Sequence, residues 1–277
     1  MSFYWIYNIS NSMLALLVIA LFNFSAFFGL IITRPLIKNY FVSKGHHNEI
    51  ASYYFAAISL LYAVILGQVT SITYSNYQEA KKTVSREASE IVTLFSELEG
   101  YKHPMSDQLE NLLLRYVRYV INNDWREHRE GIISSQSTLD LDNMEEIILT
   151  YEPKTSSETI LHSKVFDSLN NVVKARAERI QFVSNGLPKT FWLVIILGAI
   201  VTISSSFLFY FANRRLHICL ISLFSSMIAL VVFLCIVMDN PFRGDVSVDT
   251  AGYQDAIEFH TELKSKRFQK VTDGPRP

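Results

Sequence analysis

Four long stretches of this 277-residue chain contain no Asp, Glu, Lys or Arg. Each is longer than the roughly 20 residues that a helix needs to cross a bilayer. Buried helices of soluble proteins rarely stay free of charge for so long. The sequence therefore predicts a multi-pass membrane protein whose four transmembrane helices lie near residues 12–33, 50–74, 190–212 and 216–238.

The region between the second and third stretches has a different, water-compatible pattern. Small or apolar residues recur there at intervals of three and four, which is typical of an amphipathic helix: Ala80, Val84, Ala88, Ile91, Phe95 and Leu98. The face opposite this stripe is expected to be solvated and includes Lys81, Lys82, Glu87 and Glu90. No segment alternates in the manner of a strand. The predicted fold class is therefore an all-α membrane protein with a helical insert.

Changes in composition predict four regions along the chain. Residues 1–75 form a first pair of transmembrane helices, and residues 76–188 form a soluble helical insert that continues the second helix. Residues 189–238 form the second pair. Residues 239–277 are expected to hold an irregular segment, a short helix and a mobile basic tail from Lys264.

The stretch AVILGQVTSITYSNYQEAKKTVSREASEI, from Ala63 to Ile91, passes from apolar to charged without a helix-breaking residue. It predicts one helix that leaves the membrane and continues in water. Leu60, Val64 and Gln68 are spaced by four and so share a face of that helix. Such a face suits a hydrophobic constriction that gates by wetting, or ordinary helix packing. Periodicity alone favours packing.

The chemistry of the remaining residues argues against an enzyme. Neither GxGxxG nor GxxxxGK[ST] occurs, and the histidines lack the partners that a zinc site needs. We therefore expect no catalytic residue, no metal and no cofactor. The formal net charge of -1 gives no basic field for nucleic acid, so no nucleic-acid partner is expected.

Two stretches resemble bestrophins. SLLYAVILGQVTSITYSNYQEAKK resembles the second membrane helix of that family, through Leu66, Gly67, Tyr77, Glu79, Ala80 and Lys81. MDNPFRGDVSVDTAGYQDAIE resembles the segment after the fourth helix, where Asn240, Pro241 and Phe242 match an Asn-Pro-Phe-Gly signature. The order of elements also agrees over nearly the whole chain. The sequence therefore resembles the bestrophin-like group of bacterial membrane proteins.

This resemblance implies a homopentameric channel for small anions such as chloride, in the bacterial inner membrane. The partners are then the lipid bilayer and further copies of the chain. The match at Leu66 and Gly67 implies that Leu60, Val64 and Gln68 line the narrow neck. Gln68 departs from the bulky apolar or aromatic residues common there.

The resemblance fails at the calcium site of animal bestrophins. Those proteins follow Asn-Pro-Phe with a dense acidic cluster, whereas only Asp245 and Asp249 are present here, with Arg243 between the motif and the first of them. Calcium takes six to eight oxygen ligands. We therefore expect no calcium site.

Alternatives remain open at this stage. The chain could be a membrane-anchored receptor or interaction protein whose insert binds a ligand or partner. A secondary transporter is less supported, because there are no internal repeats and no intramembrane charges. Sidedness is also open: basic residues in the short loops favour an outside insert, whereas the resemblance implies a cytosolic one.

Overall fold

The computed structural model describes the backbone of residues 4–40, 47–184 and 186–272, and the side chains in these ranges except those of residues 4, 5, 268 and 270–272. Within these ranges the regular elements are all helical. The contacts divide the chain into two compact units. We call them the membrane unit (Met1–Tyr77, Gly186–Asp239 and Gly244–Val246) and the insert unit (Gln78–Asn185, Asn240–Arg243 and Ser247–Pro277).

The membrane unit contains the predicted spans. A short 3-10 helix (Tyr4–Asn8) precedes α1 (Asn11–Tyr40), and the other long helices are α2 (His47–Leu98), α7 (Lys189–Ser206) and α8 (Arg214–Met238). In the part of the chain that the structure describes, four regions are long and apolar enough to cross a membrane: α1, α2, the region that holds α7, and α8. The predicted fold class is confirmed.

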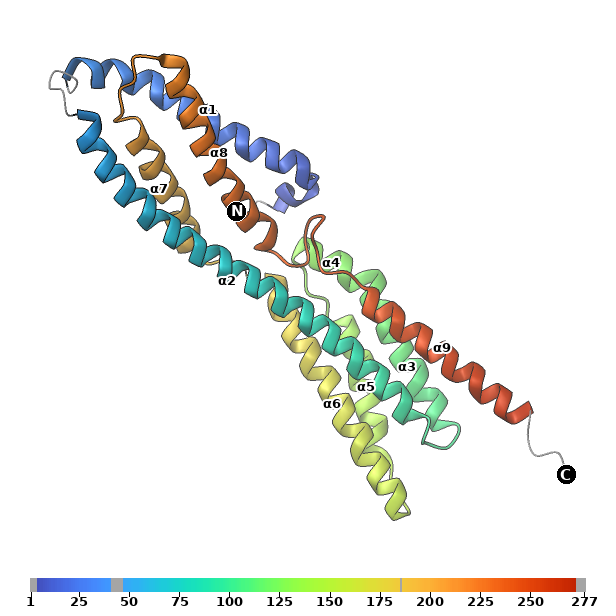
Figure 1. Cartoon of the computed structure of the whole chain (residues 1–277). Coiled ribbons are helices and arrows are strands. Elements are labelled where there is room, and N and C mark those ends of the chain that lie inside the picture. Colours follow the sequence, from blue (N-terminus) through green and yellow to red (C-terminus); the bar gives the residue numbers. More distant parts are fainter. Residues whose placement is uncertain (1–3, 41–46, 185, 273–277) are drawn as a thin grey trace. The chain divides into compact units, whose positions relative to one another are not determined.

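Helix α1 packs against α8 within this unit (Figure 1). The buried residues of α1 recur every four positions, as one face of a helix requires: Leu14, Val18, Phe22, Ala26 and Leu30. Asn23 donates a hydrogen bond of 2.8 Å from Nδ2 to Ser226 Oγ of α8. Its Nδ2 also donates to the Ile19 carbonyl in its own helix. A polar side chain in the span is thus paired at the interface.

Helix α2 is tied to α7 and α8 by side chains from its buried face. The Tyr62 hydroxyl donates to the Ile195 carbonyl of α7 over 3.0 Å. Thr70 Oγ1 lies 3.2 Å from Cys235 Sγ of α8. A Cβ added to Gly198 of α7 would lie 2.5 Å from the Tyr62 ring, so the absence of a side chain there lets the ring pack directly on the α7 backbone.

Helix α7 ends at Ser206, earlier than the predicted residue 212. The hydroxyls of Ser205 and Ser206 donate to the Thr202 and Ile203 carbonyls over 2.7 and 2.6 Å. Such local side-chain bonds compete with the helical pattern near a terminus. The next residue, Phe207, packs so closely on α1 that a Cβ on Gly29 would lie 2.4 Å from its ring.

The insert unit is a bundle of helices that includes the second half of α2, and α2 itself is one continuous helix (Figure 1). Its other elements are α3 (Met105–Tyr119), a π-turn (Val120–Asp124), α4 (Trp125–Glu130), α5 (Gln136–Thr150), α6 (Ser156–Ser184) and α9 (Ala251–Thr272). The predicted stripe on α2 forms part of its core: Ala80, Val84, Ala88, Ile91, Phe95 and Leu98 are buried.

Helix α9 is longer than the sequence predicts and continues through Lys264 to Thr272. Asp249 Oδ1 accepts a hydrogen bond of 3.2 Å from the Ala251 amide, which caps the helix start. Its buried positions, Tyr253, Ala256 and His260, are spaced by three and four. Residues 273–277 of the predicted tail lie outside the described residues.

Gly198→Ala should destabilise the membrane unit, because the new methyl would displace the buried Tyr62 ring. We expect a loss of about 1–3 kcal/mol, the usual cost of overpacking. Gly67→Ala is the matched control: a Cβ there meets no atom within 4 Å, so its stability should stay the same or rise. Thermal unfolding of the purified protein in detergent measures both. Equal melting of Gly198→Ala and wild type would contradict the contact.

Candidate functional site

The three predicted neck residues lie on one exposed face of α2. Leu60 and Val64 are 66% and 55% exposed, and Gln68 is also exposed. Tyr62 and Leu66 on the other side are buried. The exposed surface of α2 is wider than this face, since Leu61, Ile65 and Ile72 are exposed as well. At about 100° per residue, one stripe about 100° wide within that surface continues the neck face along the helix. We call this the exposed stripe: Leu60, Val64, Gln68, Ser71, Ser75, Glu79, Lys82, Arg86, Ser89, Thr93 and Ser96. Whether the neck residues control passage stays a prediction.

The chemistry of the exposed stripe changes steadily along α2. Apolar side chains come first, then the Gln68 amide and serine hydroxyls, then charges, and from Ser89 onward hydroxyls again. Arg86 pairs with Glu178 of α6. Glu79 and Lys82 line a cleft of about 560 Å³ between α2 and α6. A helix that leaves hydrocarbon for water without a break shows this order, because its backbone bonds stay internal throughout.

The remaining matched residues of α2 point elsewhere. Ala80 is fully buried in the core of the insert unit, and Tyr77 is half-buried. Leu66 is buried in the membrane unit. Gly67 is exposed. The stretch that resembles bestrophins therefore supplies both faces of α2.

The Asn-Pro-Phe segment forms a turn in the insert unit. The Arg243 amide donates to the Asn240 carbonyl over 3.0 Å, and the Val248 amide donates to the Pro241 carbonyl over 2.8 Å. Phe242 is only 2% exposed. Its ring centroid lies 5.3 Å from that of Trp125, edge to face. The segment is therefore anchored by an aromatic side chain that packs against α4.

Trp125 connects this segment with α9. Its Nε1 donates to the Val248 carbonyl over 3.0 Å. Its ring lies 5.5 Å from the Tyr253 ring of α9, and His128 lies 5.5 Å from Phe242. Trp125 and His128 of α4 thus hold the Asn-Pro-Phe turn, and Trp125 links it to α9.

Beside this aromatic cluster lies a buried ion pair between Glu87 of α2 and Arg179 of α6. Both side chains are fully buried, and Arg179 Nε donates to Glu87 Oε2 over 2.7 Å. The Tyr116 hydroxyl donates to Glu87 Oε1 over 2.5 Å. The guanidinium also lies 3.7 Å from Asp124 Oδ2 and 5.6 Å from the Trp125 ring centre. The expectation that Glu87 is solvated is therefore wrong.

The buried pair of Glu87 and Arg179 shifts the pKa of Arg179 itself and that of the neighbouring His128. Burial would lower the pKa of Arg179, but the Glu87 carboxylate outweighs it and raises that pKa. Burial, together with the positive charges of Arg179 and Arg176, lowers the pKa of His128 to about 3. Arg179 Nη1 donates a hydrogen bond of 3.3 Å to His128 Nδ1, which accepts it as a neutral ring nitrogen. The imidazole is therefore neutral near pH 7.

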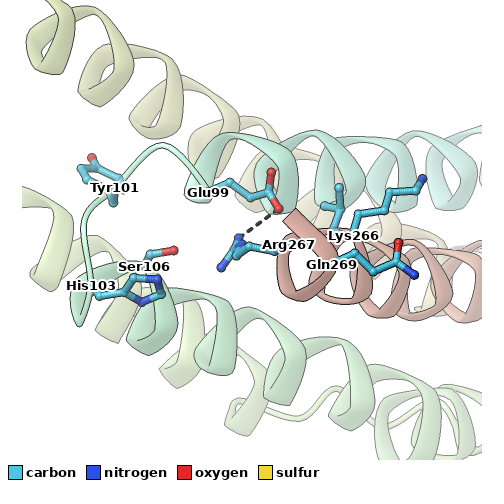
Figure 2. A pocket seen from close by; sticks show the side chains of 8 residues that line it. Glu99, Tyr101, His103, Ser106, Lys266, Arg267 and Gln269 are labelled. Atoms are coloured by element: carbon cyan, nitrogen blue, oxygen red, sulfur yellow. Dashed lines mark hydrogen bonds and ion pairs between the residues drawn. The ribbon is translucent and has the colours of Figure 1, made fainter. Parts of the chain in front are cut away.

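A second charged cluster borders a cleft of about 810 Å³ where α2 ends and α3 and α9 meet. Arg267 points toward Glu99, with Nη2 3.0 Å from Oε1 (Figure 2). The same nitrogen lies 2.9 Å from Glu110 Oε1. Burial would raise the pKa of Glu110, but hydrogen bonds from His260, Arg267 and Ser106 lower it to about 2.

The acidic residues after Asn-Pro-Phe serve as helix caps. Asp245 Oδ2 accepts a hydrogen bond of 2.9 Å from the Asn11 amide at the start of α1, and Asp249 caps α9. Across the described ranges, no group of three or more His, Cys, Asp or Glu side chains is arranged to hold a metal ion.

Comparison with known proteins gives one family. The profile of the Bestrophin-like domain matches residues 19–253. A variant of a bacterial bestrophin homologue from Klebsiella pneumoniae has a TM-score of 0.65 at 13% identity, covering 91% of this chain and 98% of that chain. Another structure of a bacterial bestrophin homologue from Klebsiella pneumoniae has a TM-score of 0.58 at 12% identity, covering 86% and 98%.

A further solved structure, named only as a variant membrane protein, has a TM-score of 0.64 at 13% identity and covers 90% of this chain and 98% of its own. No curated protein matches the chain significantly. At such low identity these structures show a shared fold alone.

Arg179→Met should destabilise the insert unit strongly, because it leaves the Glu87 carboxylate buried without its partner. We expect a loss of about 3–5 kcal/mol in the free energy of unfolding. The double variant Glu87→Gln with Arg179→Met should recover much of it. The control is Arg86→Met, which breaks an exposed pair and should change stability by about 1 kcal/mol or less. Thermal unfolding of each variant tests this.

His128 should make the insert unit acid-sensitive. Its pKa in the folded protein lies below the ordinary histidine value of 6.5, so the unfolded chain binds a proton first as the pH falls. Stability is present above pH 6.5 and is lost progressively toward pH 3. His128→Gln should flatten the fall in melting temperature between pH 7 and pH 5, whereas His103→Gln, at an exposed ring, should not. Parallel slopes for all three proteins would contradict this assignment.

Proposed function

The chain belongs to the Bestrophin-like family, and on that premise we propose that it is one subunit of an oligomeric membrane channel that passes small anions such as chloride. The observation that carries this proposal is the exposed stripe of α2. Apolar at Leu60 and Val64, it becomes polar at Gln68 on the same face. A wall of a water-filled passage needs such a face.

Gln68, Ser71 and Ser75 support a shared axis rather than lipid as the environment of this stripe. Polar side chains in hydrocarbon are costly and face a partner or water. All three are exposed in the subunit. One subunit of four spanning helices encloses little room for water. We propose a homopentamer in the bacterial inner membrane, with the five copies of α2 around the axis; the number five comes from the family resemblance.

Each neck residue has a defined role in this proposal. Leu60 and Val64 form an apolar constriction, which excludes water until it widens. Gln68 follows with an amide whose two N–H donors can hydrogen-bond to an anion that has shed part of its water. Lys82 extends the stripe with a positive charge that makes no ion pair among the described residues. No catalytic step and no cofactor is required.

The alternative is a receptor whose insert binds a ligand. It would use the 810 Å³ cleft beside α9, since that is the larger of the clefts described in the insert unit. The charges there are paired within the chain: Arg267 with Glu99 and Glu110, and Lys266 with Glu262 over 3.6 Å. Charges that are already paired within the chain are poorly available to bind a ligand. The cleft therefore supports a receptor function less than the exposed stripe supports a channel.

Val64→Ala should raise chloride flux severalfold in liposomes, because it widens an apolar constriction without adding charge. Gln68→Ala should change the relative permeability of chloride and larger anions. The control is Ile65→Ala, which removes an exposed residue one position along the helix and should leave flux unchanged. Native mass spectrometry in mild detergent should show pentamers for all four proteins.

If Val64 serves ordinary helix packing instead, the expected result of Val64→Ala is the opposite. It expects a loss of about 0.5–3 kcal/mol of stability with no change in flux. That result, or a stable monomer across detergents, would remove the basis for an axial neck.

A further inference from the structure

A partly open cavity of about 240 Å³ lies between α2, α7 and α8 of the membrane unit, and its lining residues Ala63, Gly67 and Met227 are exposed. Its lining is mainly apolar and carries no charge: Ser59, Tyr62, Ala63, Leu66, Gly67, Thr202, Phe224, Met227, Ile228 and Val231. An engineered apolar cavity of about 150 Å³ binds benzene, so this one admits a molecule of roughly ten heavy atoms. The absence of charged residues excludes an ion as its occupant.

Two hydroxyl groups in this lining have no partner. Ser59 Oγ and Thr202 Oγ1 are enclosed, and neither makes a hydrogen bond within the described part of the chain. Thr202 is only 2% exposed. Buried polar groups are nearly always paired, and an unpaired one calls for an explanation such as a bound molecule. The cavity therefore combines an apolar volume with two available hydrogen-bonding groups.

Gly67 leaves part of this space open. A Cβ at this position would meet no atom within 4 Å, although the residue lines the cavity. Gly198 differs, because the Tyr62 ring fills the space that its side chain would need. Packing inside the subunit thus explains Gly198 and leaves Gly67 without a packing role.

We propose that this cavity binds a small neutral amphiphile: a chain or ring of about ten heavy atoms with one hydroxyl group. The apolar part fills the space beside Gly67, and the hydroxyl pairs with Thr202 and Ser59. A hydroxyl both donates and accepts, so it satisfies either protein hydroxyl. Such a molecule enters from the bilayer, where neutral amphiphiles concentrate.

The cavity lies next to the neck residues of α2. Ser59, Ala63 and Gly67 line it, and each immediately precedes a neck residue, namely Leu60, Val64 and Gln68. An occupant would contact α2 beside the neck face and favour one rotation of that helix. This consequence rests on the proposed channel function, whereas binding itself does not.

Photolabelling of the full-length protein in lipid nanodiscs tests the binding. The probe is octan-1-ol carrying a diazirine. Mass spectrometry should find saturable labels on the peptides that contain Ser59 to Gly67, Thr202 or Phe224 to Val231. Unlabelled octan-1-ol should compete, and octane should compete at least about fivefold more weakly, because it lacks the hydrogen bond.

Two variants and one control sharpen the test. Gly67→Leu fills the cavity and should reduce labelling about tenfold. Thr202→Val keeps the shape, removes the hydroxyl and should weaken competition by octan-1-ol roughly fivefold. Ala57→Leu adds the same side chain at an exposed position of α2 outside the cavity and should label like wild type. Thermal unfolding confirms that each variant is folded, and Thr202→Val remains decisive if Gly67→Leu does not assemble.

Three results would overturn the site. They are labels spread evenly over lipid-facing helices, equal competition by octane, or a phospholipid acyl-chain probe that labels the cavity and is not displaced by octan-1-ol. Labelling is measured without any flux, so a chain that binds the probe but conducts no anion would refute the channel alone. Unchanged competition by octan-1-ol in a conducting Thr202→Val variant would refute the site alone.

Discussion

The ion pair between Glu87 and Arg179 is the interaction around which the insert unit is organised. Both side chains are fully buried, so their charges have to be matched by other groups of the protein. Tyr116 of α3, the π-turn residue Asp124 and the Trp125 ring of α4 complete the surroundings. Trp125 in turn contacts Phe242 and Tyr253. A single buried pair thus fixes how α2, α6 and the Asn-Pro-Phe turn meet.

Much of the fold could be predicted because its signals are local. A charge-free run of sufficient length indicates a span without knowledge of its neighbours, and α2 contains no residue that would end it. The end of α7 was predicted too late in the sequence, because the apolar pattern does not reveal that the Ser205 and Ser206 hydroxyls donate hydrogen bonds to carbonyls of their own helix. Helix α9 was underestimated because the charges around Lys264 concealed its narrow buried face, Tyr253, Ala256 and His260.

In the candidate site, too, some features could be predicted from the sequence and others could not. Spacing alone places Leu60, Val64 and Gln68 on one face, which the structure leaves exposed. Glu87 looked solvated because its partner Arg179 is 92 residues away and leaves no local pattern. The cavity beside Gly67 was also missed: an empty volume depends on three helices, and a missing side chain has no periodicity. Long-range pairing and empty space are the two features that a single sequence hides.

The packing of α1 against α8 has a consequence for how the protein is made. Asn23 and Ser226, which join these helices, are 203 residues apart in the chain. At about 5–20 residues per second, a ribosome needs roughly 10–40 s to synthesise the intervening chain. During that time the first helix already occupies the bilayer, and the Asn23 amide can bond to the Ile19 carbonyl of its own turn. The contact between α1 and α8 therefore cannot form until synthesis has passed Ser226.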